Sequence, residues 1–470
     1  MAIDYSSIFR RRHALYRANA AVWERSRDAY SGGADYIRQA LIKHVSEIDL
    51  EYQERLQRAC YINYPRKIAR TITQFVLSSG PQRENADPAL VEDFSRTGLR
   101  ADEVMRQFST LLNLYGAAAL LVEMPYFAGE LDQERKVAER IRPAVRVLSP
   151  LEVADWAYGE DGKLNWILIE ESDTLDAGPF LPAVEVKRRK LWTRSEYYLF
   201  ERDSVTGMTA ILARGENPLG MVPAVLTVEP DGFGLDHNHY FEDVVRISDA
   251  ILNNDSESQM NIVKQMFGLL VISDSFARGA RLAGNATGRD GEARRFSHVL
   301  ARSAAIWETP EERGISRYIS PSGTDSATIR EENCRLKREL FEVVGLGLAP
   351  ESRQVESAEA KSWDNFYIAQ FLRCRVDLIE QAEQAVWAFI AKLDPTVAKP
   401  RVVYNRDFAV IELRNSIESL LQLKTLVDGE EFHREIGRAA LFMLEKVKKI
   451  EPGQRNAILE EIGKGGGRDE

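Results

Sequence analysis

Three kinds of feature are scarce in this sequence, and each absence excludes a class of protein. The cysteines, Cys60, Cys334 and Cys374, stand far apart and without metal-type spacing, which favours a reducing compartment without disulfides. No apolar run reaches the roughly 18 residues that a membrane-spanning helix needs. The arginines at 10–12 are not followed by the apolar stretch of a signal peptide. We therefore expect a protein with neither disulfides nor a membrane partner.

Strings of residues typical of catalysis are also missing. Gly463-Lys464 lacks the upstream glycine, the strand and the helix of a phosphate-binding loop. The run from Ser357 to Lys361 has one residue too many for a Ser-x-x-Lys nucleophile pair. Carboxylates are common on the expected helices, but nothing singles out two of them for acid–base work. We predict a protein that is not an enzyme and that uses no cofactor.

One short segment is a candidate metal site. His237 and His239 alternate just ahead of Glu242 and Asp243, and alternating histidines in an extended segment can face one side. A polar linker followed by a helix N-cap explains the same residues without a metal. The alternative to a protein without catalytic activity is therefore an intracellular helical enzyme with a metal site near these two histidines.

Acidic residues outnumber basic ones. The chain has 62 Lys and Arg against 72 Asp and Glu, a net charge of −10 over 470 residues. A protein that holds phosphates tightly needs an excess of cations, so tight nucleic-acid binding is not expected. The same charge is also ordinary for a soluble protein of this size. With 44% hydrophobic residues the chain can bury a core, and its length suggests about three domains.

The N-terminal part has helical periodicity over residues 8–77. Its apolar positions include Ile37, Leu41 and Val45, which we expect to pack against neighbouring helices. The residue before a proline avoids the α region, so a helix boundary is expected at Tyr64-Pro65.

Two more helices are expected next, at about 88–97 and 102–115, the second with Asp102 as its N-cap. From 117 to 228 the signal changes to short β-prone runs separated by glycine-containing turns, which is typical of antiparallel meanders. We expect an α+β domain with strands at 119–122, 144–148, 166–169, 184–187, 197–200, 209–212 and 222–226.

The most informative region follows as an ordered series of elements. It comprises a helix at 240–267, a β-type run at 269–272, a Gly/Arg-rich loop at 276–297, a β-type run at 304–307, a helix at 325–344, a breaker at 345–350, a helix at 357–393, and three further helices from about 408 separated at 428–429 and 451–453. The last residues, 463–470, lack apolar side chains and are expected to be disordered. Such an order is unusual for an enzyme and suits a subunit that contributes one wedge to a ring around a channel.

Two of these helices differ in pattern. The helix at 240–267 is polar nearly all round at 253–259, so we expect it to lie between other helices with solvent near. We further expect the central helices to satisfy their surfaces only against identical neighbours around an open axis. The long helix has a fuller apolar stripe, at Trp363, Tyr367, Phe371, Cys374, Leu378, Ala382, Val386, Phe389 and Leu393.

At this point the chain resembles the portal protein of tailed bacteriophages, the head-to-tail connector. The likeness covers most of the chain but is one of architecture and loose motifs. It is carried by 63–68 (NYPRKI), 77–81 (LSSGP), 148–156 (LSPLEVADW), 217–225 (NPLGMVPAV), 251–257 (ILNNDSE) and 320–323 (SPSG).

The resemblance implies a mainly α fold with an α+β wing. Its parts would be a wing at 1–238, stem helices at 239–267 and 325–344, a clip at 268–324, a channel loop at 345–356, a channel-backing helix at 357–399, and a helical crown with its tail at 400–470. It also implies a closed ring of this chain, usually of twelve copies, at the portal vertex of the virion, after assembly in the host cytoplasm. Twelve copies at −10 each would total −120, which favours a channel wall that does not adhere to DNA.

The implied partners are double-stranded DNA in transit without sequence specificity, the terminase large subunit, head-completion or adaptor proteins, and capsid and scaffolding proteins. Another head–tail structural protein, such as an adaptor, is a further alternative, although adaptors are usually much smaller.

Two sets of residues are the candidate contacts. In the channel loop, Gly345 and Gly347 permit hinge-like dihedrals, and Arg353 and Gln354 could touch phosphates transiently. An ordinary helix–helix linker explains the same residues. In the clip, a cluster of arginines could bind an acidic motor or adaptor surface or the emerging DNA, or could be solvated without a partner. These clip residues are Arg278, Arg281, Arg289, Arg294 and Arg295, set against Asp290 and Glu292.

Overall fold

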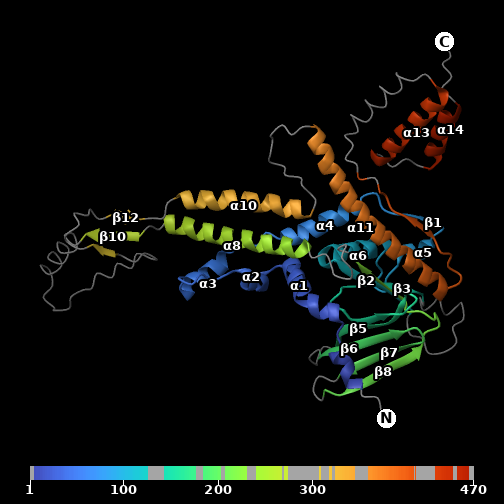
Figure 1. Ribbon diagram of the computed structural model, residues 1–470, viewed down its shortest axis with the longest axis horizontal. Helices are drawn as coiled ribbons and strands as arrows, with labels where there is room; N and C mark the ends of the chain where they lie inside the picture. Colours follow the sequence, from blue (N-terminus) through green and yellow to red (C-terminus); the bar gives the residue numbers. More distant parts are fainter. Residues whose placement is uncertain are drawn as a thin grey trace. The chain divides into compact units, whose positions relative to one another are not determined.

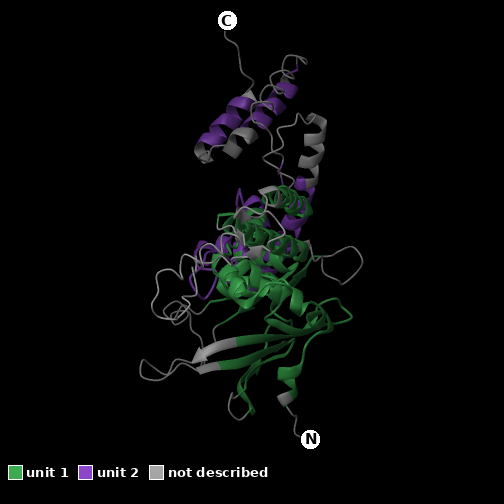
Figure 2. Ribbon diagram, turned by 90° about the vertical axis from the view of Figure 1, so that its left-hand side faces the viewer, with its two compact units in different colours: residues 1–72, 107–353 green, residues 73–106, 354–470 purple. Residues whose placement is uncertain are grey.

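The computed structural model divides the chain into two compact units, described separately below. The first comprises residues 1–72 and 107–353, and the second 73–106 and 354–470 (Figure 2). The residues that the structure describes are 5–124, 142–175, 184–202, 207–229, 240–266, 269–273, 306–308, 317–319, 323–344, 358–406, 408, 429–447 and 452–464. Among them, no helix is both long enough and apolar enough to cross a bilayer.

The first unit begins with short helices. They are η1 (Tyr5–Arg10), α1 (Ala14–Ser31), α2 (Ala34–Ala40), α3 (Asp49–Arg58) and α4 (Tyr64–Val76), which continues into the second unit. His13 caps α1, because its Nδ1 accepts the Leu15 N–H at 3.2 Å. Gly32 follows α1 with φ 65°, a conformation that glycine adopts without strain. The boundary predicted at Tyr64-Pro65 is confirmed, since α4 begins at Tyr64.

Two antiparallel sheets form the β-rich part of this unit. The strands are β2 (Ala117–Glu123), β3 (Ala144–Leu148), β4 (Val153–Tyr158), β5 (Leu164–Leu175), β6 (Val184–Thr193), β7 (Glu196–Arg202), β8 (Thr209–Glu216) and β9 (Ala224–Val228). One sheet has the order β3-β2-β9 and the other is the meander β4-β5-β6-β7-β8. The predicted α+β character is confirmed. Their shared core includes Leu121, Trp156 and Ile167.

The same unit contains a long helical hairpin with a small sheet at its end. Helix α8 (Tyr240–Met266) leads within a few residues into β10 (Leu269–Ser273), and β12 (Arg317–Ile319) leads likewise into α10 (Gly323–Val343) (Figure 1). The third strand, β11 (Ile306–Glu308), pairs parallel to β10, whereas β12 pairs antiparallel to it on the other side. Both helices and β10 lie within two residues of their predicted bounds; β12 was not predicted.

The second unit is built around the long helix α11 (Ala358–Leu393). It also contains β1 (Gln82–Glu84), α5 (Pro88–Glu92), the start of α6 (Ala101–Tyr115), β13 (Arg401–Val403), α13 (Glu430–Val447) and α14 (Pro452–Lys464). β1 and β13 pair antiparallel although more than 300 residues separate them in the chain. The last two helices begin close to their predicted breakers, and the helix expected from about 408 lies outside the described residues apart from Phe408.

Two details differ from the sequence-based expectation for the helices that begin at Pro88 and Ala101. Helix α5 ends at Glu92, five residues early. Asp102 does not cap α6 but lies in its first turn, where its carboxylate accepts a 2.6 Å hydrogen bond from the buried Arg83. The Arg100 carbonyl instead accepts the first helical bond, and the Glu103 carboxylate returns to the Arg100 N–H, as in a capping box.

Candidate interaction surface

The channel-loop residues, the clip arginines and the two candidate metal-binding histidines are not among the residues that the structure describes. Gly345, Gly347, Arg353 and Gln354 of the expected channel loop, the five clip arginines, and the histidines of the alternative metal site all lie outside the described ranges. Within those ranges, no three His, Cys, Asp or Glu side chains are grouped so that they could hold a metal ion. The roles assigned to these residues therefore stay predictions.

The polar middle of α8 faces the N-terminal helices along one stripe. Asp249, Asn253 and Ser256 are spaced i, i+4, i+7 and so lie on one face of the helix. Asp249 accepts bonds from Arg25 at 2.6 Å and from the Tyr36 hydroxyl at 2.5 Å. The Asn253 side chain accepts the Ile42 N–H at 2.9 Å, while the Ser256 hydroxyl accepts from Arg55 at 3.3 Å.

Tyr36 of α2, which donates to Asp249 of this stripe, is kept in its neutral form. Burial and the hydrogen bond to Asp249 raise the pKa of Tyr36 well above its ordinary value of 10. A tyrosine whose pKa is raised in this way keeps its proton in mild alkali and still donates to Asp249. The neighbouring Tyr61 has its pKa raised to about 12, chiefly by burial. The α1–α2–α8 contact is therefore insensitive to mild alkali.

A second polar stripe on α8 faces α10. Asn254 donates to the Asn333 side-chain oxygen at 2.9 Å, and Asn333 donates to Asp255 at 2.6 Å. Seven residues further along α8, Asn261 donates to Ser326 at 3.2 Å, and Ser326 is seven residues back from Asn333. The two helices therefore run antiparallel in a constant register.

These contacts confirm one expectation for α8 and correct another. The helix does lie between other helices, as its polar middle predicted. The expectation that its polar surface needs identical neighbours is wrong for this stretch, because α1, α2, α3 and α10 of the same chain supply the partners. The reason is that the two polar stripes are about one residue apart, which turns them about 100° from each other around the helix axis. Each stripe can therefore pair with a different helix of the same chain.

The segment from the end of α2 into the first turn of α3 is unusual because it presents aliphatic side chains to solvent. We call Ile42, Val45, Ile48 and Leu50 the loop patch; their exposed fractions are 72%, 100%, 61% and 68%. The helical pattern over 8–77 predicted that Val45 packs in the same stripe as Leu41, but only Leu41 is buried. The chain leaves the helical path after Ala40, so the pattern no longer selects one buried face.

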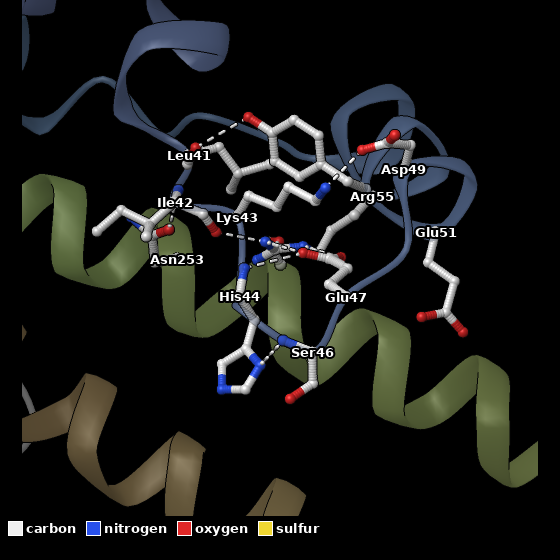
Figure 3. Close-up of polar contacts among 12 residues, drawn as sticks. Leu41, Ile42, Lys43, His44, Ser46, Glu47, Asp49, Glu51, Arg55 and Asn253 are labelled. Atoms are coloured by element: carbon white, nitrogen blue, oxygen red, sulfur yellow. Dashed lines mark hydrogen bonds and ion pairs between the residues drawn. The ribbon is translucent and has the colours of Figure 1, made fainter.

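Polar contacts on the inner side fix this loop in place. The Arg55 side chain is 4% exposed and donates to both Glu47 carboxylate oxygens, at 2.9 and 2.8 Å, and to the Ile42 carbonyl (Figure 3). Tyr52 donates to the Leu41 carbonyl at 3.1 Å. The Lys43 ammonium reaches Asp49 at 2.5 Å, and this hydrogen bond lowers the pKa of that carboxyl group.

An open groove of about 350 Å³ lies between this loop and α8. Its walls combine charges of both signs, including Glu47, Arg55, Glu257 and Lys264. Lys264 lies 3.6 Å from Glu51 of α3, so this end of α8 is beside the first turn of α3. The groove has no excess of positive charge, and nothing about it favours a phosphate ligand.

Comparisons with known proteins give only distant likenesses. No family model matches the sequence, and no curated protein matches it either. Among solved structures, a chain of the neck of a native GTA particle, computed with C12 symmetry, is 11% identical, with a TM-score of 0.41 over 79% of this chain and 89% of that one. A chain of the neck of an empty GTA particle, computed with C6 symmetry, is 12% identical, with a TM-score of 0.39 over the same shares. Similarity at this level assigns neither a family nor a function to this chain.

Proposed function

We propose that this chain is a structural subunit of a phage-like portal or neck ring. The observation that carries the proposal is the hairpin of α8 and α10, which bears a small sheet at its end in the element order that the sequence predicted. At 1.5 Å per residue, the 27 residues of α8 span about 40 Å. A stalk of this length that bears a small module where its two helices end is what the stem and clip of such a subunit require.

The middle of α8 is held in one orientation, as a ring wall requires. Asp249, Asn253 and Ser256 tie α8 to three N-terminal helices, so the hairpin cannot rotate about its axis without breaking several hydrogen bonds. A subunit with a fixed hairpin orientation presents the same faces in every copy. Identical presentation is a condition for closed cyclic symmetry.

The basic residues 188–190 on β6 are neutralised inside the chain, which suits a protein that lets DNA pass. Arg188 pairs with Glu201 at 2.8 Å, Arg189 with Glu170 at 2.8 Å, and Lys190 with Glu123 at 2.6 Å. Cations already paired with carboxylates release few counterions from DNA, so they add little to its binding. This supports a structural role in which the duplex is surrounded and not held.

The finer assignments belong to the same proposal. Residues 345–356 would meet DNA in the channel, and the clip arginines would dock the terminase motor or an adaptor. Packaging and ejection of double-stranded DNA at the portal vertex would follow from these contacts, with capsid and scaffolding proteins around the wing. Deleting 347–354 should leave ring assembly intact and impair packaging, whereas replacing Arg294 and Arg295 with glutamate should weaken motor docking.

Mass photometry and negative-stain imaging of the purified full chain test the central claim. Closed rings with an open centre support it. A protein that stays monomeric from nanomolar to micromolar concentration contradicts it. Metal analysis of the same sample addresses the alternative, because stoichiometric zinc that is lost on replacing His237 and His239 would favour the enzyme.

A further inference from the structure

The loop patch reverses the usual arrangement of a surface loop. Its backbone polar groups turn inward to Arg55, Tyr52 and Asn253, while its four aliphatic side chains are exposed to solvent. Exposed aliphatic side chains gathered in this way mark interaction sites in soluble proteins. Because the polar contacts hold the loop before any partner binds, docking costs little conformational entropy.

Two further exposed apolar side chains lie on α8, next to the loop patch along the helix axis. Ile262 and Met266, one turn apart on α8, are 47% and 73% exposed. At 100° per residue, these side chains point about 140–180° away from Glu257, which lines the groove beside the loop. They are also level with the loop, because Lys264 reaches Glu51 in the first turn of α3. The chain thus carries apolar surfaces on opposite sides of α8 at one height.

We infer that the loop patch of one copy packs against the Ile262–Met266 face of α8 in the next copy of this chain. This inference rests on the proposed ring and names the contact that closes it. A head-to-tail contact closes into a ring only when donor and acceptor surfaces differ and recur at the same height in every copy. The two surfaces described above meet both conditions.

The chemistry of the patch favours this occupant over DNA or an acidic partner. Its charged neighbours are already paired, Lys43 with Asp49 and Glu47 with Arg55. Burying one aliphatic side chain contributes about 1.5–3 kcal/mol, which at about 25 cal/mol per Å² corresponds to about 60–120 Å² of surface removed from water. Four such side chains would therefore bury about 240–480 Å². A standard interface buries about 800 Å² on each partner, so the patch supplies the apolar centre of such a contact.

A photo-crosslinking residue placed at Val45 in the full chain tests the contact directly. Irradiated rings should give a ladder of covalent multimers, and digestion should map the linked peptide to residues near Ile262 and Met266. The same crosslinker at Leu212, a 49% exposed side chain on β8, should leave monomers. A product that stops at dimers, or a linked peptide elsewhere, overturns the inference.

Charge pairing provides an independent test that a merely structural role would not pass. Val45→Glu and Met266→Lys should each weaken ring assembly at least tenfold, and the double variant should recover most of the loss, since every interface then pairs the two charges. Leu212→Glu is the control and should assemble normally. Unchanged rings in both single variants contradict this contact while leaving the ring itself intact. A wild-type chain that never forms rings contradicts the proposed function instead, so the two failures are distinguishable.

Discussion

Helices α8 and α11 are both long, yet they are held by opposite means. Helix α8 is hydrogen-bonded to its neighbours through two stripes of amides, hydroxyls and carboxylates. Its buried apolar side chains lie mostly in its first half. Helix α11 buries Val376, Ile379, Val386 and Ile390 almost completely. The Glu383 carboxylate of this helix is fully buried and receives three donors.

The comparison shows that the contacts that set the alignment of two helices need not be those that contribute most to stability. Hydrogen bonds such as Asn254–Asn333 contribute little net free energy each, but a shifted register leaves them unpaired, so they select one alignment. Apolar packing along α11 contributes more free energy and tolerates small shifts better. A stalk that must hold one orientation gains from the first kind of contact, and a helix at the centre of a core gains from the second.

The largest effect is expected at the carboxylate inside the α11 core. Glu383→Ala removes the acceptor of Trp387 and Tyr404 and the buried one of the two carboxylates that pair with Arg83, the other being Asp102, which costs about 3–5 kcal/mol of unfolding free energy. Urea unfolding, together with hydrogen exchange of the second unit, measures it. Glu431→Ala, at an 80% exposed side chain, is the control and should change little. A loss below 1 kcal/mol would show that α11 does not depend on this residue.

The seam between α8 and α10 should respond next. Asn333→Ala leaves Asn254 and Asp255 without their partner, with an expected loss of about 1–3 kcal/mol. Hydrogen exchange should rise along α10 more than along α11. Cys334→Ala, at the adjacent exposed residue, is the matched control. Equal exchange in the two variants would argue that apolar contacts alone hold the hairpin.

A smaller effect is expected where α8 meets α3. Ser256→Ala removes one 3.3 Å bond from Arg55, which keeps Glu47 and the Ile42 carbonyl, so the loss should be about 0.5–1.5 kcal/mol. Ser258→Ala on the same helix is the comparison variant and should cost less. Thermal unfolding of both variants provides the measurement, and the reverse ranking would contradict the first stripe.

The smallest effect, at the rim of the second unit, depends on pH. Burial alone would raise the pKa of Glu380, but the bonds from Arg406 and the Tyr404 N–H outweigh it and lower that pKa below its ordinary 4.5. A lowered carboxyl pKa stabilises the fold above pH 4.5, and this stabilisation is lost as the pH falls through the folded-state value. Arg406→Gln should therefore cost about 0.2–1 kcal/mol at pH 7. The difference from the wild type should shrink in urea titrations below pH 4.5, and a difference that grows there would reverse the assignment.

Local signals predicted the long elements well. Asp394-Pro395 stops α11 at Leu393 as expected, and the polar stretch at 253–259 correctly predicted helices on more than one side of α8. The predicted apolar stripe of α11 is confirmed at Ala382 and Val386 but is wrong earlier in the helix, where Cys374 is exposed while Leu372 and Val376 are buried. A shift of one or two residues turns a helix face by 100° or more, and buried polar residues such as Glu383 conceal the true stripe from a pattern of apolar letters.

Contacts between distant residues could not be predicted. Nothing near Gln82–Glu84 indicates that this three-residue strand pairs with Arg401–Val403, and Arg83 meets Glu383 across 300 residues. The loop patch was missed for a different reason. Ile42, Val45 and Ile48 recur every three residues, which is also the spacing of a buried helical face. Only the position of the backbone after Ala40 distinguishes an exposed patch from a core.

The strand order β11-β10-β12 has a consequence for how this part of the chain can change. The chain enters the small sheet through β10 and leaves it through β12. These two strands are antiparallel neighbours, so the end of β12 lies beside the start of β10. Insertions or deletions between Ser273 and Ile306 therefore need not alter the distance between the end of α8 and the start of α10. Evolution, or an engineer grafting a foreign peptide there, can vary that stretch while the helices beneath it stay aligned.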